Sequence, residues 1–104
     1  MKLGEVAVAQ GKLEEAARAY GDGLGIAKKL AEGDPSNTLM QRDLWVSYWR
    51  LADMAERQEK AGEAKGYWKQ AFDVLSGIAK QGLQLSSQDR QYLETLRRKA
   101  VAAP

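Results

Sequence analysis

Residues 64–78 read AKGYWKQAFDVLSGI, and residues 16–30 read AARAYGDGLGIAKKL. The two stretches lie 48 residues apart, and they carry small, aromatic and aliphatic residues at corresponding positions. Self-similarity at a fixed period over many apolar positions indicates an internal structural repeat. The pairs at this offset are Leu3 with Leu51, Ala16 with Ala64, Tyr20 with Trp68, Leu24 with Phe72, Leu30 with Ile78 and Ala31 with Ala79.

Apolar residues recur every three or four positions along nearly the whole chain, and no segment alternates as a strand does. Residues 33–35, with the sequence GDP, end one helical stretch, and Ser36 or Asn37 is suited to cap the next. Residues 86–89, SSQD, resemble a capping box with aspartate in place of glutamate. The sequence therefore predicts an all-α fold of about five helices, near residues 2–10, 12–32, 37–59, 61–81 and 87–101.

Two residue types that carry much of protein chemistry are missing. The 104 residues include no cysteine and no histidine. Without cysteine there are no disulfides, thiolate ligands or thiol nucleophiles, and without histidine the commonest general base and metal ligand are absent. The carboxylates, lysines and hydroxyls that remain form no known catalytic pattern. We therefore expect neither an enzyme nor a bound metal or cofactor.

Charge and hydropathy narrow the choice of partners. The net charge is +2, and the whole excess falls in residues 86–104, so that residues 1–85 are neutral. This balance predicts no broad phosphate-binding face and therefore no nucleic-acid partner. No stretch approaches the ~20 apolar residues that a membrane span needs, and the first residues lack the apolar run of a signal peptide. We expect a cytoplasmic protein with no membrane association.

Each copy of the repeat pairs a leucine and a small residue with an alanine that stands four positions before an aromatic residue. The first copy has Leu3-Gly4, Ala16-x-x-x-Tyr20 and Pro35, and the second has Leu51-Ala52 and Ala64-x-x-x-Trp68. These steps resemble the tetratricopeptide repeat family. The second copy departs from the family by Ala52 in place of glycine and by the absence of a later proline. The period also departs, because it is 48 residues rather than ~34.

The resemblance implies antiparallel two-helix repeats stacked as a short right-handed α-solenoid, in a long-helix variant. Residues 1–33 would form a truncated first repeat, residues 34–81 a second repeat, and residues 82–104 a terminal or capping helix. The start midway through a first helix suggests a fragment of a longer array. Because repeats bury one another's faces, apolar surface should remain at the N-terminal side, and a homodimer is one way to cover it.

In this family the first helices of the repeats line a groove that receives peptides, which here implies residues 2–10, 37–59 and 87–101. The tryptophans on this side are either groove anchors or core residues packed on the helix of residues 12–32. The charged residues either contact a ligand or form a solvated surface, where they pair within each helix and offset its dipole. The candidate binding residues are Trp45, Trp49, Arg50, Asp53, Arg57, Arg97 and Arg98.

The function that this pattern favours is a protein–protein interaction scaffold that binds a peptide or partner protein in the groove. The alternative is a structural or oligomerisation element that joins protomers or domains without a peptide ligand. Tryptophans exposed in a monomer would favour the first function, and a symmetric interface that buries them would favour the second. RNA binding, as in the related pentatricopeptide repeats, is the weaker hypothesis, because that class reads bases with polar pairs at regular positions.

Overall fold

The computed structural model describes residues 12–82 and 85–101, and these residues form four α-helices and no strand. The helices are α2 (Leu13–Gly33), α3 (Thr38–Arg57), α4 (Ala61–Lys80) and α5 (Ser87–Val101). Each bound lies within two residues of the sequence prediction, so the all-α fold and these four helices are confirmed. The helix expected over residues 2–10 lies outside the described residues.

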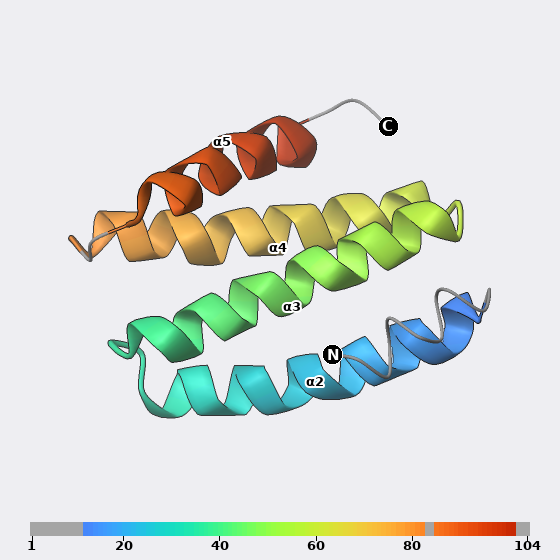
Figure 1. The fold of residues 1–104 in the computed structure, drawn as a ribbon, viewed down its shortest axis with the longest axis horizontal. Coiled ribbons are helices and arrows are strands. Elements are labelled where there is room, and N and C mark those ends of the chain that lie inside the picture. The colour runs from blue at the N-terminus through green and yellow to red at the C-terminus, as the bar shows by residue number, and fades with distance from the viewer. Residues whose placement is uncertain (1–11, 83–84, 102–104) are drawn as a thin grey trace.

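The four helices lie in an open row, and successive helices run in opposite directions (Figure 1). α3 packs between α2 and α4, and α5 packs on α4. No Cα atoms within 8 Å join the described parts of α2 to α4 or α5, or those of α3 to α5. The row is therefore not closed into a bundle. Within the described ranges, no helix is both long and apolar enough to cross a bilayer.

Local side-chain chemistry sets the helix starts on either side of the pair α3–α4. The Asn37 side chain accepts a hydrogen bond from the Met40 backbone N–H at 3.1 Å, which caps α3. The Ser86 hydroxyl accepts one from the Asp89 backbone N–H at 3.0 Å and caps α5 in the same way. Such caps satisfy backbone donors that have no partner within the first turn. Both were among the caps that the sequence predicted.

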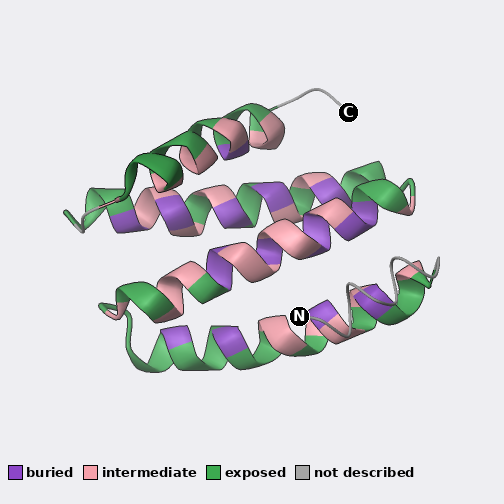
Figure 2. Ribbon diagram, in the orientation of Figure 1, coloured by how far each residue is buried: buried purple, intermediate pink, exposed green. Residues whose placement is uncertain are grey.

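The core falls into two clusters of buried side chains, and the buried faces of the helices point toward one another (Figure 2). The smaller cluster joins α2 to α3 through Ala16, Tyr20, Leu51 and Met54. The larger one takes most of its side chains from α3 and α4 and includes Leu96 of α5. α3 contributes to both clusters, as expected for a helix with a neighbour on each side.

The two copies of the repeat bury corresponding residues at their first aligned positions but differ in burial at a later one. Ala16 and Ala64 are both buried, and so are Tyr20 and Trp68. At a later aligned pair, Ile78 is 3% exposed whereas Leu30 is 50% exposed. The reason is the number of neighbours, because α4 packs against both α3 and α5 and α2 packs against α3 alone among the described helices.

Candidate functional site

The two predicted tryptophan anchors lie in the interior between α3, α4 and α5. Trp45 is only 2% exposed, and Trp49 is half-buried. The Trp49 ring centroid lies 5.2 Å from that of Trp68 on α4 and 5.3 Å from that of Tyr92 on α5. Trp45 lies 5.6 Å from Tyr92 in the same measure. Their aromatic neighbours thus belong to α4 and α5, whereas the sequence pointed to residues 12–32 as the packing partner.

Two ionic contacts join α3 to α5 on either side of these rings. At one end Arg42 pairs with Asp89, and the Arg42 guanidinium lies 5.5 Å from the Trp45 ring centroid. At the other end Glu56 pairs with Lys99 at 3.5 Å. Since no Cα atoms of the described parts of α3 and α5 approach within 8 Å, these long side chains and the rings bridge the two helices. The space that the predicted groove would offer is therefore occupied by the protein's own side chains.

The two buried indoles differ in their hydrogen bonding. The Trp68 indole N–H donates to the Glu56 carboxylate at 2.7 Å, and the Lys99 ammonium lies 4.7 Å from the Trp68 ring centroid. The Trp45 indole N–H is buried and has no hydrogen-bond partner among the described residues. A buried donor without a partner lowers stability by about 1–3 kcal/mol. A contact of this N–H with a neighbouring ring is a weaker substitute for a hydrogen bond.

The five charged candidates do not converge on one place. The Arg50 guanidinium lies 5.8 Å from the ring centroid of Tyr20 on α2. Asp53 and Arg57 pair with each other within α3 at 3.1 Å, and Arg57 is exposed while Asp53 is partly exposed. On α5 Arg97 pairs with Glu94 at 3.6 Å, also within one helix, and Arg98 is exposed. These intrahelical pairs match the solvated-surface interpretation of the sequence.

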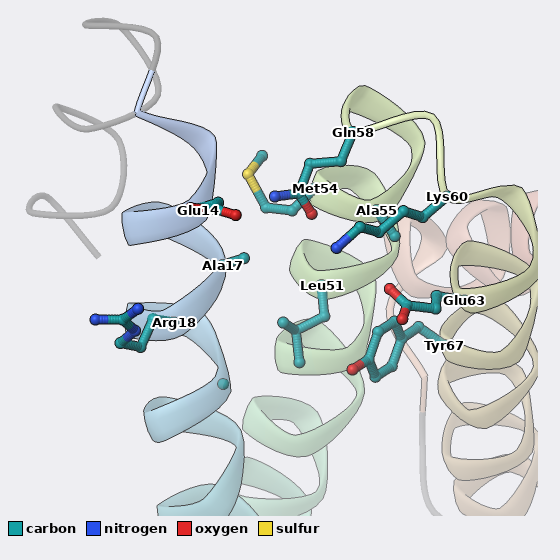
Figure 3. A pocket seen from close by; sticks show the side chains of 11 residues that line it. Glu14, Ala17, Arg18, Leu51, Met54, Ala55, Gln58, Lys60, Glu63 and Tyr67 are labelled. Carbon is teal, nitrogen blue, oxygen red and sulfur yellow. The ribbon is translucent and has the colours of Figure 1, made fainter.

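A hollow of about 350 Å³ opens between α2, α3 and α4 (Figure 3). Leu51 and Met54 from α3, both largely buried, and Tyr67 from α4 lie at its base, and most of the surface that lines the hollow is polar. Ala17 and Gly21 on α2 leave room along one wall, and a Cβ added at Gly21 would have nothing within 4 Å. The remaining lining residues are Glu14, Arg18, Ala55, Gln58, Lys60 and Glu63.

Charged side chains of both signs are among the residues that line the hollow. Glu14 and Arg18 stand on α2, and Lys60 and Glu63 stand across from them at the start of α4 (Figure 3). Among residues 12–82 and 85–101, none of these four groups forms an ion pair within 4.0 Å. The turn that carries Lys60 is fixed by a hydrogen bond from its backbone N–H to the Ala55 carbonyl at 2.8 Å.

The hollow continues toward the start of α2. A second hollow of about 630 Å³ is lined in part by Glu14, Gln58 and Lys60, which the two hollows share. The second hollow adds Lys12, Leu13 and Glu15. We call the two together the α2–α4 groove.

One feature of the sequence indicated this groove but was not used to predict it. At the 48-residue offset Ala17 aligns with Lys65, and Gly21 aligns with Lys69. Two small residues on α2 thus stand where the second copy has long side chains. A small residue that departs from the pattern of its own repeat marks a place where space is left.

Within the described ranges, no group of three or more acidic side chains is placed to hold a metal ion. Comparison with protein-family models, with curated protein sequences and with solved structures found no match to this chain. The chemistry of the groove is therefore derived from its own residues alone.

Proposed function

We propose that this protein is an interaction scaffold, built as a short right-handed stack of tetratricopeptide-like repeats, that binds a segment of a partner polypeptide in the α2–α4 groove. The open row of helices and the corresponding residues that α2 and α4 bury at their first aligned positions support the stack. The single observation that carries the binding proposal is the hollow between α2, α3 and α4, where charged side chains of both signs stand around Leu51, Met54 and Tyr67.

The groove suits a peptide with an apolar anchor and polar flanks. Binding sites for small ligands and peptide anchors are concave and mostly apolar, with a few polar groups that fix orientation. A hollow of about 350 Å³ has room for one or two apolar side chains. Because Glu14 and Lys60 stand on opposite walls, a bound segment meets both signs of charge. We therefore expect a mixed sequence rather than a uniformly acidic or basic one.

This groove differs in position from the one that the family resemblance implied. The implied groove lies along α3 and α5, where Trp49 and Tyr92 fill the space between the helices. The α2–α4 groove instead lies over the C-terminal half of α3. It is a hollow at the surface, whereas the charged candidates on α3 and α5 are partly engaged in pairs within their own helices.

A peptide-selection experiment with matched glycine variants tests the proposal. The full chain is immobilised and screened against a displayed library of random 12-residue peptides, and selected peptides are then measured by fluorescence anisotropy. Gly21→Leu places a side chain into the hollow, so we expect a loss of affinity of tenfold or more. Gly77→Leu is the control, because it makes the same change in the interior of α4, at a position that does not line the groove.

Leucine favours helix over glycine at both sites, so circular dichroism should show both variants folded. Enriched peptides that bind wild type and Gly77→Leu alike, but bind Gly21→Leu weakly, support the groove. Selection that yields no enriched peptide contradicts the proposal. Equal affinity for both variants also contradicts it, because the peptide would then bind elsewhere.

A further inference from the structure

α5 is held in place by fewer buried side chains than any other described helix. Leu96 is its one buried residue, whereas α2 buries four residues, α3 seven and α4 five. Its backbone approaches that of α4 and of no other described helix. Segments with few buried apolar contacts open locally at a lower free energy than the core of a protein. α5 is therefore the described helix that separates from its neighbours most readily.

The two ionic contacts between α5 and α3 add little to this attachment. The Arg42 side chain, which pairs with Asp89, is 40% exposed, and the Lys99 side chain, which pairs with Glu56, is 39% exposed. Ion pairs with such exposure are screened by salt and contribute little to stability. They do distinguish the two ends of α5, because Arg42 meets its start and Glu56 meets its last turn. Complementary charges of this kind select the direction of a bound helix.

The face that α5 covers is built by α3 and α4 alone. The rings of Trp49 and Trp68 meet edge to face at 5.2 Å, and the Trp68 indole N–H donates to the Glu56 carboxylate at 2.7 Å. The Arg42 guanidinium lies 5.5 Å from the ring centroid of Trp45 on the same helix. None of these contacts involves α5, so the face is formed in advance, which lowers the cost of binding. We call Arg42, Trp45, Trp49, Glu56 and Trp68 the aromatic face.

α5 itself shows which chemistry fits the aromatic face. Its Tyr92 ring lies 5.6 Å from that of Trp45 and 5.3 Å from that of Trp49. Leu96 stands four positions further along, on the same side of the helix, and is fully buried. A fitting helix therefore carries, in order and on one side, an acidic, an aromatic, a leucine and a basic residue, as α5 does at Asp89, Tyr92, Leu96 and Lys99.

We propose that the aromatic face is a binding site for a helix, that α5 is its internal ligand, and that an amphipathic helix of a partner protein with the α5 pattern takes the place of α5. Because α5 is tethered, it competes at an effective concentration on the order of millimolar. A free helix therefore binds well only when α5 is weakened. This site is separate from the α2–α4 groove and goes beyond the proposed function.

A peptide of α5 tests the proposal against the full chain. The probe is a fluorescein-labelled peptide of residues 86–101, which includes the Ser86 cap, and its binding is followed by fluorescence anisotropy. Leu96→Asp in the protein places a charge on the side of α5 that packs on α4, and so releases α5. We expect this variant to bind the probe at least tenfold more tightly than wild type. Gln91→Asp is the control, because it makes the same charge change at an exposed position of α5; its affinity should stay within twofold of wild type.

A second probe peptide with Tyr92→Asp should not bind, because it lacks the ring that contacts Trp45 and Trp49. Equal affinity of wild type and Leu96→Asp for the first probe would place the peptide elsewhere and overturn the inference. Absence of binding to Leu96→Asp overturns it as well. A wild-type dimer in sedimentation that Leu96→Asp abolishes would mean that two copies exchange α5, and it would also overturn the inference.

Circular dichroism and hydrogen exchange test whether α5 separates from a folded remainder. Leu96→Asp should lose no more helical signal than α5 contributes, and complete unfolding of the variant would overturn the inference. In the wild-type protein, amides of residues 90–100 should exchange at least tenfold faster than those of residues 65–75 in α4. Equal protection of the two helices would mean that α5 opens only with the whole protein, which contradicts its role as an exchangeable ligand.

Discussion

α2 and α4 carry the same apolar pattern, yet α4 buries an apolar residue where α2 leaves the aligned residue half exposed. Ala16 and Ala64 are equally buried, whereas Leu30 and Ile78 differ from 50% to 3% exposed. The difference lies in the neighbours, since α4 has α3 and α5 and α2 has α3 among the described helices. A repeat pattern thus tells which residues are suited to burial, and the position in the row decides which of them are buried.

The largest expected effect is a difference in the free energy of unfolding between substitutions at the aligned residues Leu30 and Ile78. Ile78→Asp should lower the free energy of unfolding by about 3–5 kcal/mol, because it buries an unpaired charge among apolar side chains. Leu30→Asp should change it by no more than about 0.5 kcal/mol, because the side chain is half exposed. Urea unfolding of each variant, followed by far-UV circular dichroism, measures both values.

Protein concentration is the control for this pair. If Leu30→Asp destabilises the protein nearly as much as Ile78→Asp at every concentration, Leu30 is covered in the isolated chain and the comparison between the two helices fails. A loss that grows with concentration would instead show self-association through the surface around Leu30.

The next prediction compares the loss of stability at the two buried tryptophans, and the expected difference is of intermediate size. Trp45→Phe and Trp68→Phe remove the same atoms from sites that are 2% and 3% exposed. Only Trp68 donates a hydrogen bond, at 2.7 Å to Glu56. Trp68→Phe should therefore cost about 1–2 kcal/mol more than Trp45→Phe, which removes a donor that has no partner.

Urea unfolding midpoints and slopes measure this difference. Glu56→Gln in the Trp68→Phe background is the matched control, because the carboxylate should then contribute little beyond its pair with Lys99. If Trp45→Phe proves as costly as Trp68→Phe, the Trp45 indole has a partner in solution and the contrast between the two sites is wrong.

Local signals predicted the helices well. The stop at Pro35, the cap at Asn37 and the cap at Ser86 each depend on a few adjacent residues, and the periodicity of the apolar residues depends on one helix at a time. Such information is complete within a short stretch of sequence. This is why four predicted helices agree with the structure to within two residues.

Contacts between distant residues were not predictable in the same way. Arg42 and Asp89 stand 47 positions apart, and their pairing depends on how α5 lies across α4. Trp49 meets Tyr92 for the same reason. The position of α5 is set by the fit of whole faces, which no spacing rule describes. The α2–α4 groove was not predicted because it forms where side chains are small. Patterns of large apolar residues identify the side chains that fill the core and do not identify such spaces.

The smallest expected effect concerns the helix backbone itself. Gly25 of α2 aligns with Asp73 of α4, and both are exposed residues inside a helix. A Cβ at Gly25 would have nothing within 4 Å, and alanine favours the helix over glycine by about 1 kcal/mol. Gly25→Ala should therefore raise the free energy of unfolding by about 0.5–1 kcal/mol, measured in urea, and slow hydrogen exchange over residues 20–26. Asp73→Ala in α4 is the matched control and should gain less, because aspartate already restricts the unfolded chain. Equal gains in the free energy of unfolding at the two positions would mean that the glycines of α2 do not make α2 a less stable helix than α4.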